Sequence, residues 1–124
     1  MPAAQPKIPG PDHPITISPS HGRVRVRLGG DVIAETSDAL DLTEATYPVV
    51  HYIPRNAVQM DRLVKTDHST HCPYKGDASY FSIVAKDGTR VENAVWSYET
   101  PFPAMREITG YLAFYPNKVE IRAG

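Results

Sequence analysis

The stretch ASYFSIVAKDGTRVENAVWSYE, residues 78–99, holds two runs of β-forming residues around a short polar turn. In the first run Tyr80 and Ser82 point to one face and Phe81 to the other, the two-residue period of a half-buried strand. The Asp-Gly pair in KDGT is a strong hairpin signal, because these residues adopt positive φ easily. NAVWSYE is therefore predicted to return as the partner strand, which the prolines of TPFP end.

Similar runs lie on both sides of this hairpin: RVRVRL (23–28), VIAET (32–36), ALDLT (39–43), VVHYI (49–53), YLAFY (111–115) and VEIR (119–122). The first two are expected to pair through GGD, and the last two through PNK. A short turn of helix followed by a strand fits PRNAVQMDRLV, and AMREITG predicts one short helical segment. Seven or eight short antiparallel strands predict an all-β, mainly β domain, arranged as a sandwich or a barrel-like pair of sheets.

Length and composition are those of one ordinary globular domain. The chain has 124 residues, of which 41% are hydrophobic and 22% charged, and its formal net charge is −1. This charge balance gives no field that would attract nucleic acid or an anionic membrane, so neither is predicted as a partner. No apolar run is long enough to span a bilayer, and no signal-peptide pattern is seen. With its single cysteine, the chain is expected in the reducing cytoplasm.

Prolines are concentrated at the beginning of the chain, where six of the twelve fall within the first nineteen residues. Each proline fixes its own φ and lacks a backbone donor, which excludes helix and central strand there. Residues 1–20 are therefore predicted to be a proline-rich arm, disordered or laid along the body. The folded domain is predicted to span residues 21–124.

Cys72 is the first candidate for chemistry, because a thiolate is a good nucleophile when a nearby cation lowers its pKa. Lys75 lies three residues further on, across a proline-led turn, so its ammonium group is expected near the sulfur. His51 is the better-placed candidate for a base, since the adjacent His71 would point to the opposite face of an extended chain. The alternative is that Cys72 is a small buried apolar residue.

Metal, phosphate and carboxylate chemistry receive less support from the sequence. His68, His71 and Cys72 lie close together, but zinc sites usually combine two paired ligand knuckles, so no metal is predicted. There is no phosphate-binding glycine motif, and no cofactor is predicted. Glu35 and Glu44 are interpreted as surface charges. The stripe Arg23, Arg25 and Arg27 fits a solvated strand face better than an anion site.

Aromatic residues are abundant for a chain of this length, with seven tyrosines and one tryptophan. If the 78–99 hairpin forms, Tyr80 lies beside Trp96 or Tyr98 on neighbouring strands. We therefore predict an apolar ligand pocket that has aromatic walls and polar anchors at its rim. The walls are Tyr52, Tyr80, Trp96 and Tyr98, and the anchors are Lys75 and Arg55. Packing of these rings in the core is the alternative.

The motif Thr70, Cys72-Pro73-x-Lys75-Gly76, Ala78 and Tyr80, with Trp96-x-Tyr98 and the stretch 110–114, closely resembles the bacterial family known as domain of unknown function 427. The resemblance covers about residues 21–122 and leaves the proline-rich arm outside. It implies a small, mainly β domain with a β-tent-like sheet arrangement, whose relatives often bind zinc or a ligand in an aromatic pocket. A nucleotidyltransferase-like label accompanies the family, although no nucleotide motif is found in this chain.

Two departures from the family limit what the resemblance implies. This chain lacks the paired cysteine knuckles of the zinc-bearing relatives, so metal binding is not implied. The family often has tyrosine before Tyr52, where this chain has His51, which argues against His51 as an obligatory base.

The leading hypothesis is a binding module for an unidentified small molecule, with an aromatic pocket and with Cys72 and Lys75 at its rim. The first alternative is an enzyme in which Cys72 and Lys75 are catalytic and act on a small, nucleotide-like substrate. The second alternative is a protein-interaction domain, which would expose apolar area in place of a closed cleft.

Overall fold

The computed structural model describes residues 6–124, which form ten β-strands and three short 3₁₀ helices. The strands are β1 (Ile15–Pro19), β2 (Val24–Leu28), β3 (Asp31–Thr36), β4 (Leu40–Glu44), β5 (Val50–Tyr52), β6 (Leu63–Cys72), β7 (Gly76–Val84), β8 (Arg90–Ser97), β9 (Ala113–Phe114) and β10 (Glu120–Ala123). The helices are η1 (Arg55–Ala57), η2 (Met60–Arg62) and η3 (Pro103–Ile108). All strand pairings are antiparallel, so the all-β class is confirmed. No helix in residues 6–124 has the length and apolar content needed to cross a bilayer.

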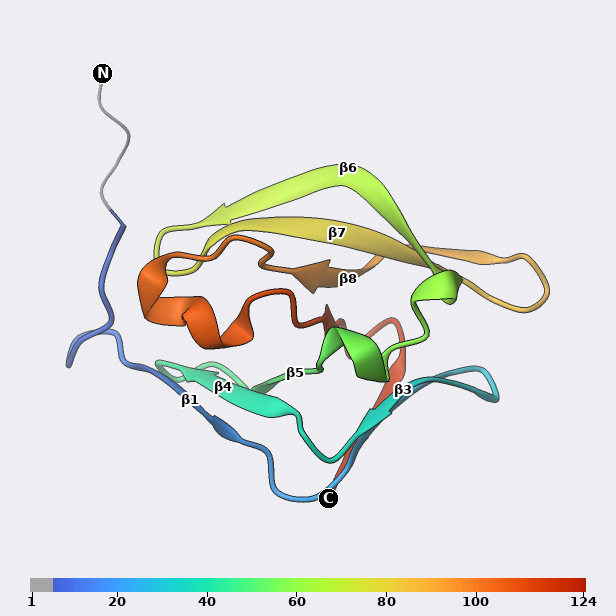
Figure 1. The fold of residues 1–124 in the computed structure, drawn as a ribbon, viewed down its shortest axis with the longest axis horizontal. Helices are drawn as coiled ribbons and strands as arrows, with labels where there is room; N and C mark the ends of the chain where they lie inside the picture. Colours follow the sequence, from blue (N-terminus) through green and yellow to red (C-terminus); the bar gives the residue numbers. More distant parts are fainter. Residues whose placement is uncertain (1–5) are drawn as a thin grey trace.

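The strands form three sheets, in the orders β1-β4-β5, β10-β2-β3 and β6-β7-β8-β9. Two backbone hydrogen bonds of 2.8 Å between Ile53 and Leu112 join the end of β5 to the segment that leads into β9. The first and third sheets therefore continue into one another as a single curved surface. Figure 1 shows its two arms, with β6, β7 and β8 on one side of the molecule and β1 and β4 on the other.

Consecutive residues of this curved surface contribute to two different hydrophobic clusters, as the period of two requires. Tyr52 and Tyr80 belong to one cluster, whereas Ile53 and Phe81 belong to the other. The second cluster also contains Val24, Val26 and Ile33 of sheet β10-β2-β3, which covers that face. In the first cluster, side chains from both arms of the surface meet, and this face is therefore the concave one. We refer to the two sides as the concave face and the covered face.

The ordered sheet begins earlier than the predicted domain boundary at residue 21. Ile15–Pro19 pair with β4 as an edge strand, where Pro19, at the end of the strand, is tolerated. Before β1, the backbone N–H of Lys7 donates to the carbonyl of Pro73 at 2.9 Å, and the His13 ring stacks on Tyr74 with centroids 4.1 Å apart. The segment from Lys7 to His13 therefore lies along the body. The prediction for residues 1–5 lies outside the described residues.

The last two predicted strands do not form the expected hairpin. β9 pairs with β8, whereas β10 pairs with β2 in a different sheet. Each strand thereby finds its own partner edge, and the turn after Tyr115 carries the chain from the curved surface to the covering sheet. The other two hairpin predictions are confirmed, because β2 pairs with β3 and β7 pairs with β8. Gly29 and Gly88 supply the positive φ in those turns, +64° and +89°.

Candidate functional site

Aromatic side chains from β5, β7 and β8 meet on the concave face. The register of β7 and β8 places Tyr80 directly opposite Trp96, so their side chains project from the same side. The indole N–H of Trp96 donates a hydrogen bond of 3.2 Å to the Tyr52 hydroxyl, and the two rings meet edge to face at 6.4 Å. The structure therefore brings together three of the four rings expected to form the pocket walls, and Tyr98, two residues after Trp96, joins them.

A cavity of about 220 Å³ opens between these rings. Its lining residues are Leu42, Glu44, Tyr47, Pro48, Val50, Tyr52, Lys75, Tyr80, Trp96, Tyr98 and Tyr115. Tyr47 is 62% exposed and stands with Pro48 at the rim, in the loop between β4 and β5. Six aromatic side chains and one ion pair thus surround a space that is large enough for a single substituted ring, since a dry cavity of about 150 Å³ holds benzene.

One wall of the cavity carries a chain of hydroxyl groups. The Tyr80 hydroxyl lies 3.0 Å from Oγ1 of Thr70 and 3.2 Å from the hydroxyl of Tyr115. Burial, reinforced by the contact with Tyr80, raises the pKa of Tyr115 to about 12. The Tyr115 phenol is therefore neutral at physiological pH and can both donate and accept hydrogen bonds.

Tyr52 and Tyr98 form the deepest part of the lining, and both are almost fully buried. Burial raises the pKa of Tyr52 far above its ordinary value, and the hydrogen bond from Trp96 offsets only part of that effect. Burial likewise raises the pKa of Tyr98, and the nearby Tyr52 phenol adds to the shift. Both hydroxyls consequently keep their protons at any pH that the folded protein encounters in a cell.

A charged pair closes one end of the cavity. Nζ of Lys75 donates to Oε1 of Glu44 at 2.5 Å, and Nε2 of His13 lies 2.7 Å from the other carboxylate oxygen. The side chains of Lys75 and Glu44 are only 11% and 15% exposed. Burial alone would raise the pKa of Glu44, but the hydrogen bonds from Lys75 and His13 outweigh it and hold that pKa below its usual value. Glu44, interpreted from sequence as a surface charge, is thus a paired carboxylate inside the site.

Cys72 lies beside this charged pair and not on the cavity surface itself. Its Sγ atom is 3.9 Å from Nζ of Lys75, and the partly buried side chain packs against the concave-face cluster. Cys72 and Lys75 are neighbours because Cys72 pairs with Gly76 across the turn that joins β6 to β7. The ammonium group is shared between the thiol and the Glu44 carboxylate, which is the nearer partner.

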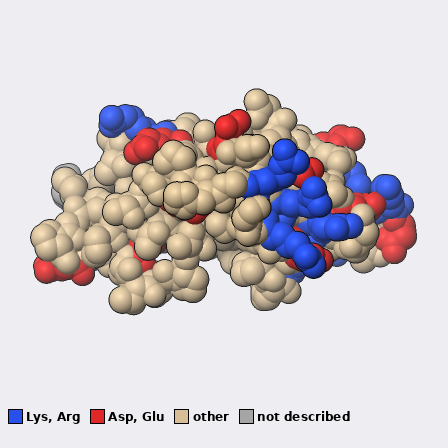
Figure 2. Space-filling model, turned by 90° about the horizontal axis from the view of Figure 1, so that it is seen from below, with Lys and Arg blue, Asp and Glu red and all other residues tan. Residues whose placement is uncertain are grey.

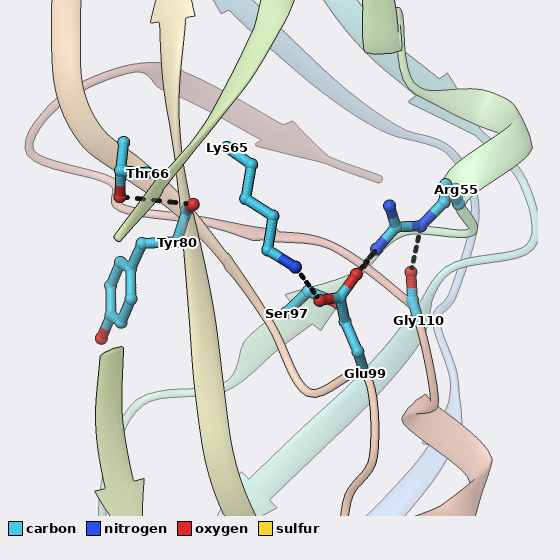
Figure 3. A network of polar contacts seen from close by, with 7 residues as sticks. All are labelled: Arg55, Lys65, Thr66, Tyr80, Ser97, Glu99 and Gly110. Atoms are coloured by element: carbon cyan, nitrogen blue, oxygen red, sulfur yellow. Dashed lines mark hydrogen bonds and ion pairs between the residues drawn. The ribbon is translucent and has the colours of Figure 1, made fainter. Parts of the chain in front are cut away.

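Arg55 does not reach the cavity. Its guanidinium donates to the Gly110 carbonyl at 3.1 Å and to the Glu99 carboxylate at 3.1 Å, and it lies over the ring of Phe81 on the covered face. Lys65 donates to the same carboxylate at 2.7 Å. Figure 3 shows this group, with the phenol ring of Tyr80 extending away from it. The predicted rim anchor is therefore part of a separate polar network that ties η1 to the end of β8.

The histidines near the motif have other partners. Nδ1 of His71 lies 2.7 Å from the Asp77 carboxylate, and His68 meets the Tyr80 ring edge to face at 4.5 Å. His51 contacts Asp41 at 2.6 Å on the side of β5 opposite Tyr52, so it does not face the Cys72 sulfur. Within residues 6–124 no three histidine, cysteine or acidic side chains gather in a way that could hold a metal ion.

The arginine stripe lies on sheet β10-β2-β3, away from the cavity. Arg23 and Arg25 both contact the Glu35 carboxylate, at 3.3 Å and 2.6 Å, and Arg122 of β10 is opposite Arg25. Figure 2 shows the basic side chains gathered on this side of the molecule, with acidic side chains among them. Arg23 and Arg25 are thus ion-paired on this strand face.

The fold and the cavity define a small all-β domain with an aromatic, partly charged hollow on the concave face of a curved sheet. The chain belongs to the family described as Domain of unknown function (DUF427), whose model matches residues 16–123. The match includes most of β1, and thus begins where the ordered sheet begins. A search of curated proteins found no match to this chain.

Sequence reasoning missed Tyr47, Tyr115 and Glu44 as lining residues. Tyr115 follows β9 and reaches the cavity because β9 pairs with β8 beside Trp96; their rings lie 4.5 Å apart. Alternation along YLAFY was the signal that could have found it, since Tyr111, Ala113 and Tyr115 share a face. No local pattern marks Glu44, which comes to the cavity through the pairing of β4 with β5.

Proposed function

We propose that this domain binds a small organic molecule in the concave-face cavity. The observation that carries the proposal is the composition of the lining, in which aromatic rings surround a buried Lys75–Glu44 pair and several hydroxyl groups. Ligand sites are usually apolar hollows with a few converging polar groups, and this cavity has that composition. Its volume of about 220 Å³ lies below the usual range of about 300–1,000 Å³, which favours a ligand with one ring.

The experiment is a fragment screen followed by backbone amide chemical shifts in ¹H–¹⁵N NMR spectra. Ligands of the proposed kind should shift the amides of β5, β7 and β8 on the concave face and leave those of β2 unchanged. Trp96→Ala should weaken binding at least tenfold while retaining dispersed spectra, because it removes a wall of the cavity. Val64→Ala, at an exposed position on β6, is the matched control and should bind as the wild type does. Shifts that occur at random over the surface, or an undiminished affinity in Trp96→Ala, would overturn the proposal.

The second candidate function is thiol chemistry at Cys72, and the 3.9 Å distance between its Sγ and Nζ of Lys75 favours it. Cys72 and Lys75 would then act together on a small, nucleotide-like substrate in the adjoining cavity, with the ammonium group stabilising the thiolate. The rate of iodoacetamide alkylation against pH tests this function. Lys75→Met should slow the alkylation of the folded protein, because it removes the ammonium group that stabilises the thiolate. If Cys72 is alkylated only at urea concentrations that unfold the protein, thiol chemistry at this residue is contradicted.

With its single cysteine the chain suits a reducing compartment, and the cytoplasm is the location that we propose. The partner proposed in either case is the small molecule itself.

A further inference from the structure

Two phenol groups in the cavity have hydrogen-bonding capacity that the protein does not use. Tyr98 is only 6% exposed, yet its hydroxyl has no hydrogen-bond partner among residues 6–124. The oxygen of the Tyr52 hydroxyl accepts the indole N–H of Trp96, but its proton has no acceptor in the same part of the chain. Both tyrosines line the cavity, where a hydroxyl group without a protein partner can bond to an atom of a ligand.

Both phenols are donors in the folded protein. Tyr52 lies close enough to contribute to the raised pKa of Tyr98, and burial keeps both phenols protonated. Lys75 is near them, because its Nζ is 6.0 Å from the centre of the Tyr98 ring. This part of the cavity therefore presents hydrogen-bond donors, and the matching ligand atom is an acceptor.

The charges in the cavity indicate an uncharged ligand. The ammonium of Lys75 is already paired with Glu44, and both groups are mostly buried. An anionic ligand would compete with Glu44 for the same ammonium, and a cationic ligand would meet Lys75 at close range. A neutral acceptor, such as a carbonyl oxygen, leaves this pair undisturbed and still satisfies the two hydroxyls.

The remaining walls favour a flat molecule. The rings of Trp96 and Tyr115 lie 4.5 Å apart, and the rings of Tyr80 and Tyr115 lie 14° from parallel. Aromatic faces stack on planar aromatic rings in offset or edge-on geometry, which adds to the energy of area burial. We propose that the ligand is an uncharged planar ring that carries a carbonyl oxygen, and that this oxygen accepts hydrogen bonds from Tyr98 and Tyr52. This inference rests on the proposed binding function.

The experiment uses the only tryptophan of the chain, Trp96, as a fluorescent reporter within the cavity. Four probes of similar size are titrated into the whole chain: benzamide, toluene, benzoate and cyclohexanecarboxamide. Benzamide should change the emission at the lowest concentration, because it alone combines a flat ring, a neutral charge and a carbonyl oxygen. Tyr98→Phe should lower the affinity for benzamide about 2- to 10-fold, which is the effect of one net hydrogen bond. The affinity for toluene should not change.

Tyr111→Phe is the matched control, because Tyr111 packs in the same cluster without lining the cavity; benzamide affinity should not change. Tyr52→Phe is the second variant, in case Tyr98→Phe does not fold, and circular dichroism verifies the fold of each. Equal affinity for benzamide and toluene, or tighter binding of benzoate, overturns the carbonyl inference but leaves the binding function standing. If none of the four probes changes the emission or the amide shifts of the concave face, both proposals fail.

Discussion

Nζ of Lys75 donates a hydrogen bond to Oε1 of Glu44 across 31 positions of sequence, and both side chains are mostly buried. The pair joins the turn between β6 and β7 to the end of β4, which lie on opposite arms of the curved surface. His13 contacts the same carboxylate, so the segment before β1 is fixed to this point as well. The lysine of the family motif therefore holds the cavity closed at one end.

The first prediction concerns this pair. Lys75→Met leaves the buried carboxylate without its main donor, and Glu44→Gln leaves the ammonium without its acceptor. Each single substitution should lower the free energy of unfolding by about 1–3 kcal/mol, the cost of a buried polar group that has lost its partner. The double variant should lose clearly less than the sum of the two, because the remaining charge is removed together with its partner. Urea unfolding followed by Trp96 fluorescence measures all three values, and strict additivity would contradict the coupling.

The second prediction is a dependence of stability on acid pH. The pKa of Glu44 is lower in the folded protein than in the unfolded chain, where it is about 4.3. Its contribution to the free energy of unfolding is therefore complete above that value and disappears as the pH falls through the folded pKa. Glu44→Gln should lose less stability than the wild type between pH 6 and pH 3. Parallel curves for the two proteins, measured by urea unfolding at each pH, would show that Glu44 does not contribute.

Much of the fold could be predicted from local patterns. The alternation around Tyr80 and the Asp-Gly turn are sufficient to specify the β7–β8 hairpin, because both signals lie within one short stretch. By contrast, the two extra residues of β8 near Asn93 form a bulge that alternation does not reveal; there Asn93 adopts a φ of +48°. β1 was missed because its flanking prolines indicate an arm, and only pairing with β4 makes it a strand.

The candidate site was predictable where its residues share one hairpin. Tyr80, Trp96 and Tyr98 reach the cavity by the period of two along adjacent strands. Glu44 arrives by tertiary pairing alone, and its local sequence resembles that of any exposed strand end. Arg55 was expected at the rim of the cavity, and it lies elsewhere because of its local structure. It follows Ile53, which faces the covered side, and the helical turn η1 directs its guanidinium to Glu99.

The third prediction concerns alkaline pH. The pKa values of Tyr52, Tyr98 and Tyr115 are all raised in the folded protein, the last to about 12, above the unfolded value of about 10. The stability that depends on these neutral phenols is thus complete below pH 10 and decreases as the pH rises toward the folded pKa values. Unfolding in urea between pH 9 and pH 11.5 should show this decrease, and Tyr98→Phe should show a shallower one. The same slope in the two proteins would contradict the burial of an ionisable phenol at this position.

The last prediction explains the glycine of the Cys-Pro-x-Lys-Gly motif. Gly76 is buried and has a φ of +110°, a conformation that residues with a Cβ atom rarely adopt. An added Cβ would meet only ordinary contacts, the nearest at 3.5 Å from the Phe102 nitrogen, so the cost of Gly76→Ala is backbone strain and not a clash. We expect a loss of about 1–3 kcal/mol in the free energy of unfolding.

Because the same turn orients Lys75 toward Glu44, Gly76→Ala should also lower the affinity for any ligand that binds beside the Lys75–Glu44 pair. Gly30→Ala is the matched control: this glycine lies in the β2–β3 turn, has no positive φ, and has open space around its Cα. It should change stability by less than about 0.5 kcal/mol, since an exposed turn position without strain tolerates a methyl group. Equal losses in the two variants would mean that glycine in the motif serves chain flexibility in general. A loss confined to Gly76→Ala would tie the motif to the geometry that places the lysine in the cavity.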